Sequence, residues 1–409
     1  MNRRSFIKAT SAVLGFPALI PASALGRAGR PAPSERITLG FIGYGTQGRY
    51  NASNFLQDDR VQAVAVCDCN RESKLYGYNS GEPGGRDTGT RAVNEHYAKK
   101  TGQPTYNGCA SFVDFRELLE TPGLDAVMIC TPDHWHAVMA IAAMRKGLHV
   151  YCQKPLSLSI TEGRAMADVA KKTGVIFQTG SQQRSDTYFK MAVEFIRNNR
   201  LGKIHKVEIG LPKAWHKFYG RTGALASFEP CAVPDGLDYE LWTGPSPMRP
   251  YCSSLQPLSW RSNYDFAGGV LTDWGAHHSD IVQWAFDKDL SGPTSIENIK
   301  AVEMPPAGGV FNVAKGFSYD FVYPGGERVT VNNELEIGIR FYGENDRSLF
   351  VTRGSIKTNP AELIREKIKE NEIHVYASRA HERNFIDCIY SGQPTVAPCE
   401  VGHRSNTIG

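Results

Sequence analysis

No charge of one sign dominates this sequence, which sets 46 lysines and arginines against 42 aspartates and glutamates for a formal net charge of +4. Without a basic excess, nucleic acid is not an expected partner. The nine cysteines include no C-x-x-C pair, so most should be small buried hydrophobes rather than parts of a disulfide framework. The apolar run near the N-terminus, residues 12–20, is too short to span a bilayer. What remains, 409 residues with 41% hydrophobic and 22% charged content, is typical of a soluble chain with about two domains.

Residues 1–35 have the composition of an export signal followed by a linker. Arg3 and Arg4 precede a short apolar run, and the tripeptide A-S-A that ends at Ala24 offers a small-residue cleavage site. Paired arginines in this setting resemble the twin-arginine signal, so we expect a periplasmic protein that is cleaved near Ala24. The alternative, an uncleaved basic anchor, is disfavoured because Pro17 interrupts a helix and no lipid-accepting cysteine follows.

The first regular unit is a strand, a glycine-rich turn and a helix. The apolar run at residues 37–42 leads into G-Y-G-T-Q-G at residues 43–48, and the segment that follows suits a helix. Gly43 permits the tight turn, Gly45 lets the backbone approach a pyrophosphate, and Gly48 lets the helix pack closely. The N–H groups at the helix start can then bind the anion. The cofactor-binding residues expected from this turn are Gly43, Gly45, Thr46, Gln47 and Gly48.

A carboxylate follows the second strand. That strand, residues 61–66, leads to Asp68, which lies about twenty residues beyond the glycine motif. A carboxylate there can accept hydrogen bonds from an adenosine ribose and would repel a 2′-phosphate, so NAD is expected in preference to NADP. Arg71 lies nearby and weakens that preference. The alternative for Asp68 is a polar cap at the strand end.

Further along, helices and strands alternate. An irregular loop is expected at residues 71–91. This alternation implies parallel pairing with right-handed crossovers, and a Rossmann domain is expected over residues 36–182. The expected helices are near residues 93–100, 112–119, 137–146 and 160–172, and the expected strands are 125–130, 148–151 and 175–178.

At this point the sequence resembles the inositol dehydrogenase, glucose-fructose oxidoreductase and MocA family. The likeness is carried by the glycine motif, by T-P-x-x-x-H at residues 131–136, by Lys154-Pro155 and by G-G-x-x-x-D-x-x-x-H at residues 268–277. It implies that residues 183–409 form an α+β domain with a large open, mainly antiparallel sheet, and that the substrates are sugars or polyols. It also implies that Thr131, Pro132, His136 and Lys154 lie at the cofactor. We further expect a homo-oligomer formed through the C-terminal sheet.

The sequence departs from the family at two places. Gln153 replaces the glutamate of the usual E-K-P, which keeps hydrogen-bonding capacity but loses a charge beside the lysine. The resembled proteins also continue into a further helix beyond the last residues here, so we expect a truncated chain.

The chemistry of hydride transfer favours Lys154, Asp273 and His277 without the family. Removal of a hydride from a carbinol carbon needs a base for the hydroxyl proton and a group that stabilises the developing alkoxide. On one helix, Asp273, His277 and Asp280 would share a face, where Asp273 could bind a substrate hydroxyl and His277 could act as the base. The alternative for Asp273 and His277 is that their helix only packs on the sheet and its polar face is solvated. The alternative for Lys154 is an ordinary surface lysine. No metal site is expected, because the spacing of His277, His278 and Asp280 does not converge on one point.

Polar and aromatic residues beyond the sixth strand extend the expected site. Gln182 and Arg184 are expected to contact substrate or cofactor. The segment 211–261 places tryptophans and tyrosines among prolines, and these rings could stack on a sugar or could simply anchor the segment. The rings concerned are Trp215, Tyr219, Tyr239, Trp242, Tyr251 and Trp260. Strands are expected at residues 317–323, 328–333, 336–342 and 348–352, with a hairpin turn at 324–327.

Together these features predict an NAD(H)-dependent oxidoreductase that acts on a hydroxyl of a sugar, glycoside or polyol. Because the periplasm holds no pool of free NAD, the cofactor should be tightly retained. The alternative is a glycoside hydrolase that works through a transient 3-keto sugar. A non-catalytic sugar sensor is disfavoured by the presence of Lys154, Asp273 and His277.

Overall fold

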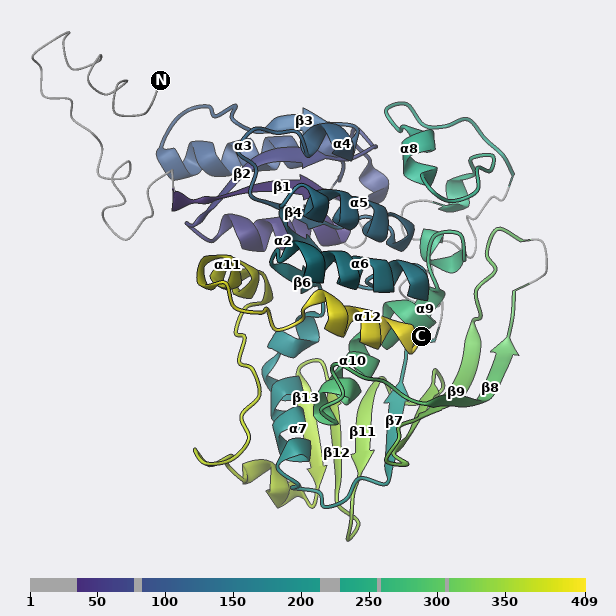
Figure 1. Ribbon diagram of the computed structural model, residues 1–409. Coiled ribbons are helices and arrows are strands. Elements are labelled where there is room, and N and C mark those ends of the chain that lie inside the picture. Colours follow the sequence, from purple (N-terminus) through teal and green to yellow (C-terminus); the bar gives the residue numbers. More distant parts are fainter. Residues whose placement is uncertain (1–34, 77–82, 214–228, 256–258, 306–308) are drawn as a thin grey trace, which may run out of the picture. The chain divides into compact units, whose positions relative to one another are not determined.

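A computed structural model describes residues 35–76, 83–213, 229–255, 259–305 and 309–409 (Figure 1). The expected export signal therefore lies outside the described residues, except for its last position. Within the described ranges, no helix combines the length and the apolar character that crossing a bilayer requires.

The N-terminal half contains a six-stranded sheet in which every pair of neighbours is parallel. The strand order is β3-β2-β1-β4-β5-β6, which is the order of a doubly wound dinucleotide-binding fold and confirms the expected Rossmann domain. The strands are β1 (Ile37–Ile42), β2 (Val61–Cys67), β3 (Ala110–Phe112), β4 (Ala126–Ile129), β5 (His149–Cys152) and β6 (Phe177–Thr179).

Both faces of this sheet are covered. On β4, Val127 and Ile129 pack with helices α4 to α6, whereas Ala126 and Met128 pack on the opposite face with α2 and α3. Burial on both sides explains why these strands are continuous apolar runs. The helices are α2 (Thr46–Leu56), α3 (Arg86–Thr101), α4 (Phe115–Leu118), α5 (Asp133–Arg145) and α6 (Ile160–Thr173).

Three boundaries in this half differ from the sequence-based expectation. Helix α3 begins at Arg86, inside the expected loop, because Gly89 is a packing residue rather than a loop residue. A Cβ at Gly89 would lie 2.7 Å from the side chains of Tyr44 and Val66. The helix expected near 112–119 is shorter: α4 covers Phe115–Leu118, and the edge strand β3 precedes it. Helix α5 begins at Asp133, so the whole D-H-W-H run lies in its first turn.

The second half forms a seven-stranded sheet in the order β13-β12-β11-β7-β10-β9-β8. All pairs are antiparallel except β10 with β7, so the expected mainly antiparallel sheet is confirmed. Strands β7, β8 and β13 were not predicted, whereas the hairpin turn between β9 and β10 was. The strands are β7 (Lys206–Gly210), β8 (Ser295–Glu303), β9 (Gly316–Val322), β10 (Arg328–Asn332), β11 (Gly338–Tyr342), β12 (Ser348–Thr352) and β13 (Ser355–Asn359).

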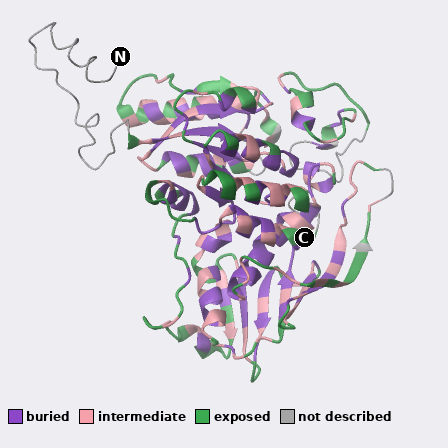
Figure 2. Ribbon diagram, in the orientation of Figure 1, coloured by how far each residue is buried: buried purple, intermediate pink, exposed green. Residues whose placement is uncertain are grey.

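Helices α7 (Thr187–Arg197) and α10 (Gly275–Ala285) pack on this sheet and form its core together with the inward-facing strand residues. Helix α10 is buried along its whole length (Figure 2). The last two helices return to the N-terminal half, where Phe385 and Ile386 of α11 join the core of the first sheet and α12 packs against α6 and α10. The helices of this half are α7 (Thr187–Arg197), α8 (Tyr239–Thr243), α9 (Gly269–Asp273), α10 (Gly275–Ala285), α11 (His381–Ser391) and α12 (Cys399–Thr407).

Candidate active site

A cavity of about 640 Å³ opens beyond the carboxyl ends of the parallel strands. This is the edge where ligands of doubly wound sheets bind. One wall comes from the turns after β1, β2, β4 and β5, and the other comes from α9, α10 and the β12–β13 turn. The predicted site residues on its wall are Gly43, Gly45, Thr46, Gln47, Asp68, Thr131, Pro132, Lys154, Gln182, Asp273 and His277. Gly48, His136 and Arg184 do not line it.

The glycine-rich turn has the geometry that its sequence predicts. Gly43 has a φ of +84°, and a Cβ at Gly48 would lie 2.1 Å from the carbonyl oxygen of Gly43. Neither position therefore accepts a side chain. Gly45 precedes α2, whose first turn has no side-chain cap, and a Cβ there would meet only the ring of Tyr76 at 3.7 Å. This opening and the uncapped N–H groups suit the pyrophosphate of a dinucleotide.

Asp68 lies at the end of β2 on the cavity wall. Its Oδ2 accepts the backbone N–H of Tyr44 and its Oδ1 accepts that of Asn70, each at 2.9 Å. The carboxylate is thus a local cap, and its remaining lone pairs can still accept bonds from a ribose diol. Burial raises the pKa of Asp68 to about 6, although both N–H groups oppose that shift.

We expect Asp68→Ala to weaken NAD binding by about tenfold or more, the usual scale for hydrogen bonds to a charged group. The preference for NAD over NADP should vanish in this variant, because nothing then repels the 2′-phosphate. In the native protein that preference should shrink below pH 6, where the carboxyl group is protonated. Calorimetry with both dinucleotides measures this. Tighter NADP binding by the native protein, or an unchanged preference in Asp68→Ala, would contradict the assignment.

Lys154 and Asp273 form an ion pair between the two halves of the chain. The Nζ of Lys154, beyond β5, lies 2.6 Å from Oδ1 of Asp273 and 2.9 Å from its carbonyl oxygen at the end of α9. Burial lowers the pKa of Lys154, and the Asp273 carboxylate opposes that change. Lys154 is therefore not a surface lysine. Asp273, which we expected to bind a substrate hydroxyl, uses one oxygen to hold the lysine.

His277 presents a neutral imidazole to the cavity. Only 4% of the residue is exposed, and its Nδ1 has no hydrogen-bond partner among the described residues. Burial lowers the pKa of His277 well below its usual value, and the charges of Lys154 and Arg353 lower it further. A neutral ring in this place can accept a proton. Because α10 is buried throughout, the alternative of a solvated polar face is wrong.

Three further ionisable residues at this end of the cavity were not predicted as site residues. Asp133 opens α5, and burial raises its pKa to about 8. The Nε of Arg261 lies 3.8 Å from Oδ1 of Asp273, and Arg353 comes from the β12–β13 turn. Asp133 stands within the T-P-x-x-x-H motif, so its sequence position was a usable signal. Nothing in the sequence around the two arginines marks them, because only the tertiary fold brings them here.

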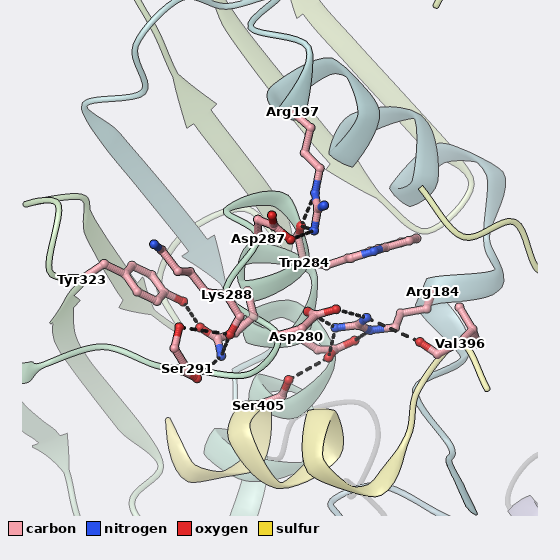
Figure 3. Close-up of polar contacts among 12 residues, drawn as sticks. Arg184, Arg197, Asp280, Trp284, Asp287, Lys288, Ser291, Tyr323, Val396 and Ser405 are labelled. Carbon is pink, nitrogen blue, oxygen red and sulfur yellow. Dashed lines mark hydrogen bonds and ion pairs between the residues drawn. The ribbon is translucent and has the colours of Figure 1, made fainter. Parts of the chain in front are cut away.

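Arg184 does not line the cavity, which corrects the sequence-based assignment. It lies instead in a cluster of polar contacts with Asp280 (Figure 3). Its guanidinium is 2% exposed and lies 2.6 and 2.8 Å from the two carboxylate oxygens of Asp280 on α10. A second carboxylate, that of Asp289, lies 2.8 Å from Nη2. Arg184 therefore holds β6 to α10, and Asp280 turns away from the cavity. In the part of the chain that the structure describes, no cluster of three side chains suited to a metal ion is found.

His136 is likewise a positioning residue rather than a cofactor contact. Its ring nitrogens lie 2.7 Å from the carbonyl oxygen of Pro155 and 2.9 Å from that of Thr131. Burial lowers its pKa to about 4, so the ring is neutral and donates one of these bonds. His136 thus fixes the two strand-end turns that carry Thr131 and Lys154.

Gln153 belongs to a buried polar network beneath Lys154. Its Nε2 donates to Oδ1 of Asn51 at 2.9 Å, and Nδ2 of Asn51 donates to Oε1 of Glu382 at 2.5 Å. Gln182 donates to the hydroxyl of Tyr151 at 3.2 Å in the same network. The network also contains the carboxyl group of Glu382 on α11, which contacts Asn51 and Tyr151. Burial raises the pKa of Glu382.

Four of the aromatic residues of the 211–261 segment anchor the segment, and two of these four also line the cavity. Trp242 and Trp260 line the cavity. They also belong, with Tyr239 and Tyr251, to a small core that anchors the segment. Trp215 and Tyr219 lie outside the described residues.

Comparison with known protein families gives two matches that together span most of the chain. Residues 37–181 match the GFO_IDH_MocA model, described as an oxidoreductase family with an NAD-binding Rossmann fold. Residues 186–330 match the companion C-terminal alpha/beta domain of the same oxidoreductase family.

Two curated relatives have different activities. The chain is 30% identical over 173 residues to a myo-inositol 2-dehydrogenase of Thermotoga maritima, covering 42% of this chain and 44% of the relative. It is also 30% identical over 189 residues to an alpha-N-acetylgalactosaminidase of Shewanella oneidensis, covering 42% and 38%. Each match thus spans less than half of the relative's length.

Solved structures share the fold over a longer span. The WlbA dehydrogenase of Bordetella pertussis, in complex with NADH and UDP-GlcNAcA, superposes with a TM-score of 0.59 at 16% identity, covering 91% of this chain and 94% of that one. The aldose-aldose oxidoreductase of Caulobacter crescentus, complexed with glycerol, gives 0.58 at 16% identity, covering 91% and 95%. At this identity the likeness shows the fold.

Proposed function

The chain belongs to the Gfo/Idh/MocA oxidoreductase family, and from this premise we propose that it is an NAD(H)-dependent oxidoreductase acting on a CH–OH group of a sugar, glycoside or polyol. One observation carries the proposal. Lys154 from the nucleotide-binding half and His277 from the other half line the same cavity as the glycine turn and Asp68. One site thus combines a candidate base, a cation and the residues that would bind the dinucleotide.

The residues divide the work of oxidation as follows. NAD, when bound, supplies the hydride acceptor. Lys154 donates a hydrogen bond to the substrate oxygen and stabilises the negative charge that develops there. His277 accepts the hydroxyl proton: its lowered pKa keeps the ring neutral before the reaction, although the same shift makes it a weaker base. Asp273 keeps Lys154 charged in a buried place.

We expect Asp273→Asn to move the alkaline limb of the kcat profile to lower pH. Burial lowers the pKa of Lys154 and the Asp273 carboxylate raises it, so losing the carboxylate leaves the lowering effect unopposed. The lysine then loses its proton, and kcat falls, at a lower pH than in the native enzyme. Steady-state profiles of kcat against pH measure the shift. An unchanged alkaline limb would mean that Lys154 does not act as the cation.

A second candidate function is net hydrolysis of a glycoside through a transient 3-keto sugar. Oxidation at C3 acidifies the C2 proton, so a base can remove it while the C1–O bond breaks, and the keto group is reduced again after water adds. Departure of the aglycone needs a proton donor. Asp133, whose pKa of about 8 keeps it protonated near neutrality, is such a donor on the cavity wall. The likeness to an alpha-N-acetylgalactosaminidase supports this alternative.

We propose further that the protein works in the periplasm with a retained cofactor. The support is the paired arginines, the apolar run and the A-S-A site of residues 1–35. Because free NAD is absent there, the site must restore its own redox state, either by processing two sugars in turn or by reducing the keto sugar that it formed.

We expect residues 1–35, fused to a reporter, to deliver it across the inner membrane only through the twin-arginine route. Exchanging Arg3 and Arg4 for lysine should block delivery, because that route reads the arginine pair. Fractionation of the reporter in strains with and without the pathway measures this. Delivery in the strain that lacks the pathway would refute the proposed location.

We also propose a homo-oligomer formed through the C-terminal sheet. Its edge strand β8 exposes apolar side chains, including Ile296 and Ile299. Light scattering of the purified protein tests this, and the mass of a single chain at working concentration would contradict it.

The direct test of function starts from the purified protein. Mass spectrometry after denaturation should find NAD that has co-purified. A panel of glycosides and polyols is then scored for both keto products and free sugars, which separates oxidation from hydrolysis. If the protein binds NAD but changes no member of the panel, the proposed activity is wrong.

A further inference from the structure

Two arginines of the cavity wall are each stacked on a tryptophan of the same wall. The guanidinium carbon of Arg261 lies 4.2 Å from the ring centre of Trp260, and that of Arg353 lies 4.4 Å from the ring centre of Trp274. All four residues line the cavity. Stacking fixes the plane of the guanidinium group and leaves the N–H groups on its edge available to a ligand. The arginine side chain therefore loses less conformational freedom when a ligand binds.

These arginines lie at the substrate end of the cavity rather than at the pyrophosphate end. Trp274 directly follows Asp273, whose carboxylate holds Lys154 at 2.6 Å, and Arg261 lies 3.8 Å from the same carboxylate. The pyrophosphate cradle, by contrast, is formed by the glycine turn beyond β1. A ligand group that meets Arg353 is therefore close to the reacting hydroxyl.

The charges at this end do not cancel. Lys154 and Asp273 neutralise each other as a close pair. Arg353 forms no ion pair within 4.0 Å in the described ranges, and it is exposed on the cavity wall. Asp133 offers little compensation near neutrality, because burial raises its pKa to about 8. Asp186, the other carboxylate here, caps α7 and keeps its negative charge. The three cations Lys154, Arg261 and Arg353 therefore face the two carboxylates Asp273 and Asp186, which leaves an excess of one positive charge.

We propose that the substrate of this site carries an oxyanion, either a carboxylate or a sulfate, which binds the guanidinium of Arg353 with Arg261 as a second donor. Guanidinium binds both oxyanions through paired N–H···O bonds, and a positive excess in a walled cavity attracts them. The inference deepens the proposed function and rests on it: the sugar that presents its hydroxyl to Lys154 and His277 is acidic.

The experiment uses holoprotein and matched probes. Calorimetry and single-turnover reduction of bound NAD compare two neutral probes, methyl glucoside and methyl glucuronamide, with two charged ones, methyl glucuronide and methyl glucoside 6-sulfate. Both anomers of each probe and the corresponding galacto compounds are included. We expect the charged probes to bind about 10- to 100-fold more tightly than the neutral ones. The carboxylate and sulfate arms identify which oxyanion the site takes.

Variants locate the effect. Arg353→Met should remove most of the preference for charged probes, and Arg353→Lys should keep part of it, because a point charge lacks the paired geometry. Arg340→Met is the matched control, since Arg340 stacks on Phe350 at 4.5 Å on the same sheet but does not line the cavity. That control should behave as the native protein.

The outcomes separate this inference from the proposed function. Equal or tighter binding of neutral probes, a preference that survives in Arg353→Met, or loss of NAD affinity as the main effect of that variant would overturn the inference. Reaction with neutral sugars alone would leave the oxidoreductase proposal standing. Binding of charged probes through Arg353 without any reduction of NAD would support the inference and refute the proposed activity.

Discussion

Replacing His277 by alanine is expected to slow hydride transfer from a glycoside to bound NAD by about 10²-fold or more, the usual scale for a lost acid-base group. In the proposed mechanism this ring is the base, and it is neutral and buried on the cavity wall. Single-turnover absorbance of the reduced nicotinamide measures the step. NAD affinity should survive, because His277 lies on α10, away from the glycine turn.

Lys154→Ala should cost a similar factor, since the developing alkoxide then lacks its cation. The double variant should lose far less than the product of the two single effects, because residues that act on one oxygen fail together. The matched controls are His205→Ala and Lys172→Ala, both exposed and outside the cavity, and they should transfer hydride normally. Near-normal transfer in His277→Ala would mean that the base lies elsewhere.

Replacing Arg184 by leucine is expected to destabilise the fold by about 3–5 kcal/mol, because it leaves the buried carboxylate of Asp280 without its partner. The close-up of this cluster shows the guanidinium between Asp280 and the carbonyl of Val396 (Figure 3). Denaturant unfolding measures the loss. Arg164→Leu, which removes a half-exposed arginine with two acidic partners, should cost no more than about 1 kcal/mol.

The pH dependence of the Arg184→Leu variant has a definite sign. Burial already raises the pKa of Asp280, and Arg184 is the main group that opposes this. Without the arginine, the folded-state pKa rises further above the unfolded value, so the variant loses stability as pH rises through that folded pKa. Adding Asp280→Leu should recover much of the loss. If the single variant is as stable as the native protein, Arg184 is not a structural residue.

Much of the fold follows from local patterns. Strands buried on both faces are continuous apolar runs, and the glycine turn between β1 and α2 has steric requirements that only glycine meets. The edge strand β3 was missed because its residues are largely exposed and carry no apolar alternation. The predicted helix near residues 93–100 was shorter than α3, because Gly89, which allows close packing, was included in the expected loop.

Site residues could be predicted from the sequence only where they belong to a recognisable motif. Lys154, Asp273 and His277 stand in motifs, whereas Arg261 and Arg353 reach the cavity from segments without any signal. Arg184 follows a strand end, yet its partner Asp280 lies 96 residues further along, and sequence position alone cannot tell which side of the strand end an arginine faces. The Lys154–Asp273 pair likewise joins residues 119 apart.

Oxidation of a sugar hydroxyl in this cavity by a bound dinucleotide can be tested with a single absorbance measurement. Holoprotein whose NAD content has been established is mixed with the glycoside panel, and the absorbance of the reduced nicotinamide is followed without added cofactor. We expect the absorbance to rise with at least one sugar, up to one equivalent of reduced nicotinamide per site, and we expect no rise in the double variant Lys154→Ala with His277→Ala. No rise with any sugar while NAD remains bound would contradict the proposed activity.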